Sequence, residues 1–205
     1  MAGLILTCGL PASGKTTLAR RLSRSLGIPM FSKDSMKELL FDTVGFRSRK
    51  EKAALGEGAM AILYYAAGQV LKAGGWVILE NNFEQASEPG LKQLLSQHLC
   101  RYITLQLVGD QRAIYERFIA RDNSPHRHRG HVVNTVYPEP PGKPPEYIPM
   151  GFDRFVEGFT ARGMEQFDIG GPRLPVDVTD FAKVDYGAAE RVLRAFMEKD
   201  ERKSG

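Results

Sequence analysis

The sequence predicts an α/β fold in which helices cover both faces of a parallel β-sheet. Short apolar segments alternate with longer segments of helical periodicity along the 205 residues, and this alternation is typical of βαβ units. The short segments contain few polar residues, as expected for strands that are buried on both faces of a sheet. With 42% hydrophobic and 25% charged residues, the composition is that of an average globular protein, and we expect one domain over residues 1–205.

Each element has its own signal. Apolar segments predict strands at residues 4–8, 28–32, 76–80, 102–108 and 174–179. Helical periodicity predicts helices at residues 15–26, closed by Gly27, at 111–122 and at 186–199. Another helix is expected to begin after Ser35, because Ser35 and Glu38 have the spacing of a capping box. A long helix ends at Gly74-Gly75, and its predicted apolar face consists of Ala59, Ile62, Leu63, Ala66, Val70 and Ala73.

Residues 121–150 show no periodicity and interrupt this pattern. They contain the run Pro-His-Arg-His-Arg-Gly-His at 125–131 and six prolines between Pro138 and Pro149. Proline fixes φ and removes a backbone donor, so we expect a surface excursion here instead of core secondary structure. Because a long irregular loop in a compact domain is usually functional or disordered, we interpret residues 111–150 as a lid followed by a proline-rich excursion.

Residues 9–16 give the strongest functional signal. They read Gly-Leu-Pro-Ala-Ser-Gly-Lys-Thr and match the pattern GxxxxGK followed by Ser or Thr, between a predicted strand and a predicted helix. In such a loop, backbone N–H groups face phosphate oxygens, the lysine brings charge to the β- and γ-phosphates, and the hydroxyl ligates Mg²⁺. The sequence therefore predicts a nucleoside triphosphate site with Thr16 as a metal ligand. The expected nucleotide-binding residues are Gly9, Pro11, Ala12, Ser13, Gly14, Lys15, Thr16 and Thr17.

Two carboxylates are predicted at the same edge of the sheet, because ligands of open α/β sheets bind beyond the carboxyl ends of the strands. Asp34 follows the second predicted strand, where it could accept the proton of an acceptor hydroxyl during phosphoryl transfer. The alternative is that Asp34 is only a favourable charge at a helix N-terminus. Glu80 ends the third predicted strand, where it could organise Mg²⁺ or simply be solvated.

A group of arginines lies in and after the predicted helix at 111–122. Arg117 and Arg121 are four residues apart and project from one face of that helix. Planar guanidinium groups bind phosphate oxygens bidentately, and arginines that close over a nucleotide stabilise the charge of the transition state. We expect Arg117 to contact the nucleotide and Arg121 and Arg127 to act in catalysis, and the alternative is a solvated basic helix. The group also includes Arg112 and Arg129.

Other notable residues have more ordinary interpretations. His126, His128 and His131 have no cysteine or carboxylate at metal-ligand spacing, which disfavours a zinc site. Cys8 is expected to be a small buried hydrophobe, and two cysteines without CxxC spacing fit a reducing cytoplasm. After the excursion, four apolar residues recur at helical spacing and are expected in the core, namely Phe152, Phe155, Val156 and Phe159.

Composition also limits the partners. The net charge of +4 is modest, and no tract interleaves Lys or Arg with aromatic residues, so a nucleic-acid partner is possible but not favoured. No apolar run approaches the roughly 18 to 20 residues of a membrane-spanning helix, and no export signal is recognised. We therefore expect a cytoplasmic protein whose partners are small molecules.

The segments GLPASGKTT, FSKDSMKELLFD, WVILENNF, YERFIARD and RHRGH span most of residues 4–131, and VDVTDF follows them. Together they resemble the P-loop kinase group that includes polynucleotide 5′-hydroxyl kinases and zeta-toxin-like kinases. The resemblance implies a three-layer P-loop NTPase sandwich with a five-stranded parallel sheet of order 2-3-1-4-5 and an arginine-containing lid. It also implies ATP with Mg²⁺, with Asp34 as the acceptor-side base and with Arg117 and Arg121 over the nucleotide.

These observations predict an ATP- and Mg²⁺-dependent kinase that transfers the γ-phosphoryl group to a hydroxyl of a small-molecule or nucleotide-like acceptor. In this interpretation Lys15, Asp34, Arg121 and Arg127 are catalytic, and Thr16 and Glu80 hold the metal. Two alternatives stay open at this point: a polynucleotide 5′-hydroxyl kinase, and a non-catalytic nucleotide-binding switch or ATPase.

Overall fold

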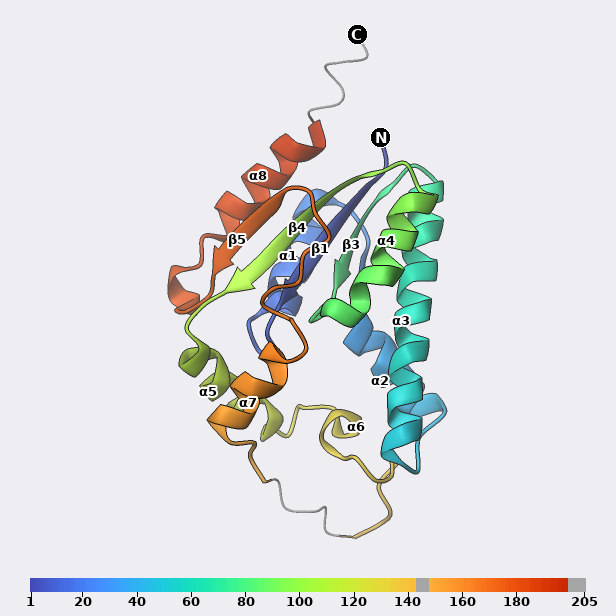
Figure 1. Ribbon diagram of the computed structural model, residues 1–205, viewed down its shortest axis with the longest axis vertical. Coiled ribbons are helices and arrows are strands. Elements are labelled where there is room, and N and C mark those ends of the chain that lie inside the picture. Colours follow the sequence, from blue (N-terminus) through green and yellow to red (C-terminus); the bar gives the residue numbers. More distant parts are fainter. Residues whose placement is uncertain (143–147, 199–205) are drawn as a thin grey trace.

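The chain forms a five-stranded parallel sheet with helices around it (Figure 1). The computed structural model describes residues 1–142 and 148–198. Its strand order is β2-β3-β1-β4-β5, which confirms the predicted α/β fold and topology. Strand β1 lies at the centre of the sheet, and all of its residues are buried. The strands are β1 (Gly3–Gly9), β2 (Met30–Ser32), β3 (Trp76–Glu80), β4 (Arg101–Val108) and β5 (Arg173–Asp177).

Helices cover both faces of the sheet and bury two hydrophobic clusters. On β1, Leu4, Leu6 and Cys8 pack in the cluster under α3 and α4, whereas Ile5 packs in the cluster under α1 and α8. This alternation follows from the period of two along a strand, and it confirms that Cys8 is a buried core residue. The covering helices are α1 (Lys15–Leu26), α3 (Arg49–Lys72), α4 (Glu88–Gln97) and α8 (Tyr186–Glu198).

The other helices lie beyond the carboxyl ends of the strands, at the lower end of the view (Figure 1). Phe155 of α7 is fully buried, and Val156 and Phe159 pack against the same cluster, as the apolar spacing predicted. No described helix combines the length and apolar character that a bilayer span requires. The helices at this edge are α2 (Lys33–Thr43), α5 (Gln111–Asp122), α6 (Arg129–Val132) and α7 (Phe152–Thr160).

The predicted start of α2 is wrong. The helix begins at Lys33, and its N-cap is Ser32, whose Oγ accepts a hydrogen bond from the Ser35 backbone N–H at 3.4 Å. Ser32 has the extended backbone that an N-cap requires, whereas Ser35 is an ordinary residue of the first turn. Asp34 therefore lies inside the helix, in its first turn.

The predicted apolar face of α3 is also shifted. Ala59 and Leu63 are buried as expected, but Ile62 is 45% exposed, and Ala73 lies at the exposed C-cap. The buried stripe continues at Ala67 and Leu71, because residues four apart share the face that packs on the sheet and α4.

Two strands are shorter than predicted, each for a local reason. Strand β2 starts at Met30, because the Ile28 N–H still bonds to the carbonyl of Ser23 at the end of α1. Strand β5 ends at Asp177, whose Oδ1 accepts from the Thr179 N–H and turns the chain. Helix α8 is observed to Glu198, and the predicted last residue, Lys199, lies outside the described residues.

Part of the predicted excursion is packed firmly on α2 and α3. We call residues 128–139 the docked segment. Val133 of this segment packs with Phe41 and Phe46 in a separate buried hydrophobic cluster. Phe46 also forms an antiparallel bridge with Tyr137. The excursion is thus ordered where it is described, and residues 143–147 of the proline-rich part lie outside the described residues.

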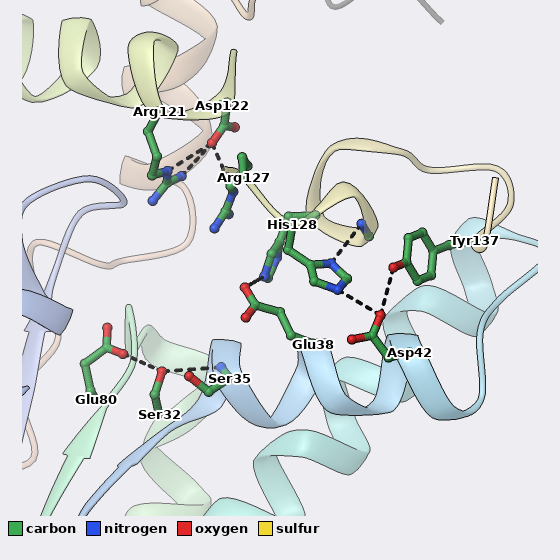
Figure 2. Close-up of polar contacts among 12 residues, drawn as sticks. Ser32, Ser35, Glu38, Asp42, Glu80, Arg121, Asp122, Arg127, His128 and Tyr137 are labelled. Atoms are coloured by element: carbon green, nitrogen blue, oxygen red, sulfur yellow. Dashed lines mark hydrogen bonds and ion pairs between the residues drawn. The ribbon is translucent and has the colours of Figure 1, made fainter. Parts of the chain in front are cut away.

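Polar contacts tie the docked segment to α2 (Figure 2). The Gly130 N–H donates to His128 Nδ1, so Nε2 carries the proton and donates to Asp42 Oδ1 at 3.1 Å. Tyr137 Oη donates to the same oxygen at 2.8 Å. His131 Nε2 lies 2.9 Å from Glu38 Oε1. Two of the three histidines therefore pair with carboxylates of α2.

Lys52 of α3 binds the docked segment through three hydrogen bonds. Its Nζ donates to the carbonyl oxygens of His131 and Val133, at 2.9 and 2.5 Å, and to Asn134 Oδ1 at 3.0 Å. Burial, with a contribution from nearby Lys37, lowers the pKa of Lys52 to about 8.

We expect Lys52→Met to destabilise the protein by about 2–4 kcal/mol, because it leaves three acceptors without their charged donor. Thermal denaturation measures the loss, and hydrogen exchange should accelerate at the amides of residues 129–134. The matched control is Lys50→Met, an exposed lysine on the same helix. Equal exchange rates in this segment for the Lys52 variant and the control would contradict the fastening role.

Gly130 is the point of closest approach between the docked segment and α2. A Cβ at this position would lie 2.3 Å from the Phe41 ring. We expect Gly130→Ala to cost about 1–3 kcal/mol of stability through overpacking. The control is Gly158→Ala in α7, where a Cβ meets nothing within 4 Å, and it should gain about 0.5–1 kcal/mol through helix propensity. Paired melting curves test this, and a neutral Gly130→Ala would disprove the close packing.

Candidate active site

A cavity of about 740 Å³ lies beyond the carboxyl ends of the strands, beside the loop at residues 9–16. Within it the structure brings together most of the residues that the sequence singled out: Pro11, Ala12, Gly14, Lys15, Thr16, Thr17, Asp34, Glu80, Arg117, Arg121 and Arg127. Gly9 and Ser13 are buried and do not line the cavity.

The backbone of the loop explains its glycines. Gly9 has φ +140° and Gly14 has φ +88°, backbone angles that residues other than glycine rarely adopt. A Cβ at Gly9 would also lie 2.6 Å from the carbonyl oxygen of Leu107. Ser13 Oγ is buried and has no hydrogen-bond partner among the described residues. The loop therefore folds tightly at positions that favour glycine, as in loops whose backbone N–H groups bind phosphate oxygens.

Lys15 opens helix α1 and is 5% exposed. Its Nζ donates to the carbonyl oxygen of Leu10 at 2.7 Å, so the side chain folds back over the loop. Burial lowers the pKa of Lys15 to about 8, although Glu80 and Asp34 oppose this shift. A neighbouring anion stabilises the charged form of an ammonium group that is buried in this way.

Glu80 is 4% exposed at the end of β3, so the predicted alternative of a solvated carboxylate is wrong. Ser32 Oγ donates to Glu80 Oε2 at 2.6 Å (Figure 2). Burial raises the pKa of Glu80, and Lys15 opposes the rise. The contact spans 48 residues of sequence and arises because β2 and β3 are paired, with Ser32 opposite Glu80.

The residues around Glu80 fit a magnesium ion that is held partly by phosphate. Among residues 1–142 and 148–198, no group of three or more His, Cys, Asp and Glu residues could hold a metal. Mg²⁺ usually keeps several waters and takes only one or two protein ligands together with substrate phosphates. The Thr16 hydroxyl and the Glu80 carboxylate are oxygen donors of this kind, and both line the cavity.

Asp34 faces the same cavity from the first turn of α2. Burial alone would raise the pKa of its carboxyl group. The charges of His131 and Arg127, followed by those of Lys37 and Lys15, outweigh burial and hold this pKa below its usual value. The carboxylate is therefore ionised at neutral pH and can accept a hydrogen bond from a hydroxyl in the cavity.

Asp122 forms ion pairs with two of the predicted catalytic arginines (Figure 2). Its Oδ1 lies 2.9 Å from Arg121 Nη2 and 3.4 Å from Arg127 Nε. The bond to Arg121 is between chain neighbours, whereas Arg127 arrives from the following loop. One carboxylate thus holds two guanidinium groups at the rim of the cavity.

Arg117 lies against Phe181, which follows β5. Its guanidinium carbon is 3.9 Å from the centre of the Phe181 ring, and its Nη1 donates to the carbonyl oxygen of Val178 at 2.7 Å. Its Nε and Nη2 are buried without a hydrogen-bond partner among the described residues. Phe181 was not among the predicted site residues, because its contact with Arg117 joins residues far apart in the chain.

Two arginines of the predicted group do not reach the cavity. The guanidinium carbon of Arg112 lies 3.6 Å from the centre of the Phe152 ring. Arg129 forms two hydrogen bonds of 2.7 Å with the carboxylate of Glu139. Both guanidinium groups therefore make contacts outside the cavity, Arg112 with α7 and Arg129 with Glu139.

The cavity also has polar lining residues that sequence reasoning did not assign: Lys33, Lys37, Asn81, Asn82, Glu84 and Arg162. The position of Lys33 beside Asp34, and of Asn81 and Asn82 after Glu80, could have indicated three of them. Glu84 and Arg162 are 78 residues apart and form an ion pair, which no local pattern signals.

Residues 4–136 match a protein-family model described as AAA domain. The chain belongs to this family. No curated protein matches the chain by sequence. The AAA domain assignment covers the loop at 9–16, Asp34, Glu80, Arg117, Arg121 and Arg127, and it agrees with a P-loop, kinase-like nucleotide-binding fold.

Solved structures support the same fold for this AAA domain protein. A candidate kinase from Chloroflexus aurantiacus shares 28% identity with it, with a TM-score of 0.78 over 95% of this chain and 97% of that chain. A gluconokinase from Sinorhizobium meliloti 1021 shares 13% identity, with a TM-score of 0.55 and 97% of each chain covered. Kti12 from Chaetomium thermophilum, in complex with ADP-AlF3, shares 21% identity, with a TM-score of 0.57 over 94% of this chain and 97% of that chain. The last two show the fold alone, and these comparisons do not single out polynucleotide kinases.

Proposed function

We propose that this protein is an ATP- and Mg²⁺-dependent kinase that transfers the γ-phosphoryl group to a hydroxyl of a small-molecule or nucleotide-like acceptor. The observation that carries the proposal is that Asp34 and Lys15 line one cavity of about 740 Å³, which has room for an acceptor beside the triphosphate. The similarity to a candidate kinase at 28% identity supports the same activity.

In this proposal the loop at residues 9–16 binds the triphosphate through its N–H groups, and Thr16 and Glu80 hold Mg²⁺. The metal supplies charge neutralisation to the phosphates. Arg117 covers the nucleotide beside Phe181, because its Nε and Nη2 are donors with no partner in the described chain. The side chains of Thr16, Glu80, Arg117 and Phe181 all line the cavity.

Asp34 orients the acceptor and receives its proton. The acceptor oxygen forms a bond to the γ-phosphorus while the bond from that phosphorus to the β,γ-bridging oxygen breaks, and the hydroxyl proton passes to the Asp34 carboxylate. Lys15, Arg121 and Arg127 stabilise the negative charge on the transferred group, since they are positioned before the reaction begins.

A transfer assay with γ-labelled ATP tests the proposal across a panel of hydroxyl compounds and a 5′-hydroxyl oligonucleotide. We expect acceptor-dependent transfer to a small molecule. Nucleotide binding without any acceptor-dependent turnover would overturn the proposal in favour of a binding switch. Transfer to the oligonucleotide alone, with affinity that falls steeply with salt, would favour a polynucleotide kinase.

We expect nucleotide binding to take up a proton at alkaline pH. Because the Lys15 pKa is about 8 in the free protein, a large part of the ammonium is deprotonated at pH 8.5, and bound phosphates restore its charge. Calorimetric titration with Mg·ADP at pH 8.5, in buffers of different ionisation enthalpy, should show uptake of up to about one proton. The uptake should vanish at pH 6.5 and in Lys15→Arg, whose guanidinium stays charged. Buffer-independent heats at pH 8.5 would contradict the expectation.

A further inference from the structure

Two lysines of α2 flank Asp34 inside the cavity. Lys33 and Lys37 are one helical turn apart, and both line the cavity. No hydrogen bond or ion pair joins either ammonium group to another of the residues described. The contact of Lys37 Nζ is with an aromatic ring, at 5.4 Å from the centre of Phe41, and Gly56 of α3 leaves room for its stem.

The negative charges of the cavity have other partners. Of the charged residues that line it, seven are Lys or Arg and four are Asp or Glu. Asp122 holds Arg121 and Arg127, and Glu84 pairs with Arg162. Glu80 accepts from Ser32. Asp34 is the remaining carboxylate of the cavity, and in the proposed function it binds the acceptor hydroxyl.

The electrostatic environment of the lysines shows that positive charges are crowded here. Burial lowers the pKa of Lys33, and Asp34 and then Glu84 oppose the shift. Burial also lowers the pKa of Lys37; Asp34 opposes this, whereas Lys33, Arg127 and Arg162 add to it. Like charges brought together out of water are stabilised when an anion joins them.

Asp34 lies between Lys33 and Lys37 in the sequence of α2, and all three side chains line the cavity. Its charge acts on Lys15 and also on Lys33 and Lys37. Lys15, Asp34 and the two lysines all line the cavity, so one acceptor can place its hydroxyl at Asp34 and a further group at the lysine pair.

We propose that the acceptor carries an anionic group, a carboxylate or a phosphate, and that Lys33 and Lys37 bind this group while Asp34 holds the hydroxyl. This inference rests on the proposed kinase function and names its substrate class. Seven cationic residues line this one cavity, whereas the net charge of the whole chain is only +4, which favours a small anionic alcohol over a polynucleotide.

Calorimetric titration of the protein loaded with Mg²⁺ and a non-hydrolysable ATP analogue tests the anion site. The ligands are two matched sets: glycerol, D-glycerate and glycerol 3-phosphate; and glucitol, gluconate and glucitol 6-phosphate. We expect at least one anionic member to bind about tenfold or more tightly than its neutral counterpart, and comparison of carboxylate with phosphate identifies the group. Lys33→Gln and Lys37→Gln should abolish this preference. Lys72→Gln, an exposed lysine of α3, should retain it, and all three variants should bind the ATP analogue normally.

The inference is overturned if no anionic member binds more tightly than its neutral counterpart. It is also overturned if the Lys33 and Lys37 variants keep the preference, or if a 5′-hydroxyl oligonucleotide binds where the small anions do not. Transfer assays with labelled ATP separate this failure from failure of the kinase proposal. Equal transfer to neutral and anionic members would reject the anion site and leave the kinase standing. Lysine-dependent anion binding without any transfer would reject the kinase and, with it, the role of the anion as part of an acceptor.

Discussion

Replacing Asp34 with Asn is expected to lower kcat for the acceptor by about 10²–10⁴-fold, the usual contribution of a general base. Asn keeps the size of the side chain but removes the charge that accepts the proton. Affinity for the ATP analogue should be retained or increased, because the substitution removes a negative charge near Lys15. Steady-state kinetics with a validated acceptor and calorimetry with the analogue measure the two effects separately.

The matched control is Asp153→Asn, because Asp153 is an exposed carboxylate in the first turn of α7. If Asp34 were only a favourable charge at a helix N-terminus, both substitutions would cost a few tenths of a kcal/mol of stability, up to about 1 kcal/mol, and leave turnover intact. Wild-type turnover in Asp34→Asn would therefore remove Asp34 from the mechanism and leave the helix-end interpretation.

Replacing Lys15 with Met is expected to lower kcat/KM for ATP by about 10³-fold or more, since it removes a preorganised charge on the transferred group. The same substitution should stabilise the nucleotide-free protein by about 1–3 kcal/mol, because a buried ammonium is exchanged for an apolar side chain of similar length. Opposite effects on stability and activity are typical of a residue that is held in place for function.

The pH dependence of stability gives an independent measurement. The Lys15 pKa is about 8 in the folded protein and 10.5 in its ordinary environment, so the unfolded chain binds more protons between these values. This term makes the free energy of unfolding rise from pH 8 towards pH 10.5. The rise should be smaller in Lys15→Met, in which the lowered pKa of Lys52 still contributes to it. The exposed control Lys50→Met should show neither the gain in stability nor the change in pH dependence. A Lys15→Met protein that is less stable than wild type at pH 7 would contradict the account of Lys15 as a strained, buried charge.

Local signals in the sequence determined most of the framework of this protein. The bounds of α1, β3 and α5 follow directly from apolar periodicity and from Gly27 at the end of α1. The phosphate-loop pattern at residues 9–16 and the polar residues at the strand ends were sufficient to predict that Lys15, Asp34 and Glu80 lie at one edge of the sheet. These features depend on a few neighbouring residues, so they can be read without knowing what packs against them.

Only the tertiary structure decided which of several residues of the same type form the contacts of the site. Ser32, and not Ser35, caps α2, and its hydroxyl also reaches Glu80 on the neighbouring strand. Arg121 and Arg127 reach the cavity, whereas Arg112 and Arg129 are held by Phe152 and Glu139. The docked segment, fastened by Lys52 across about eighty residues of sequence, brings His131 towards Asp34. Such contacts join residues far apart in the chain, and they are fixed by how α2, α3 and α5 pack around the cavity, for which the sequence carries no local periodic signal.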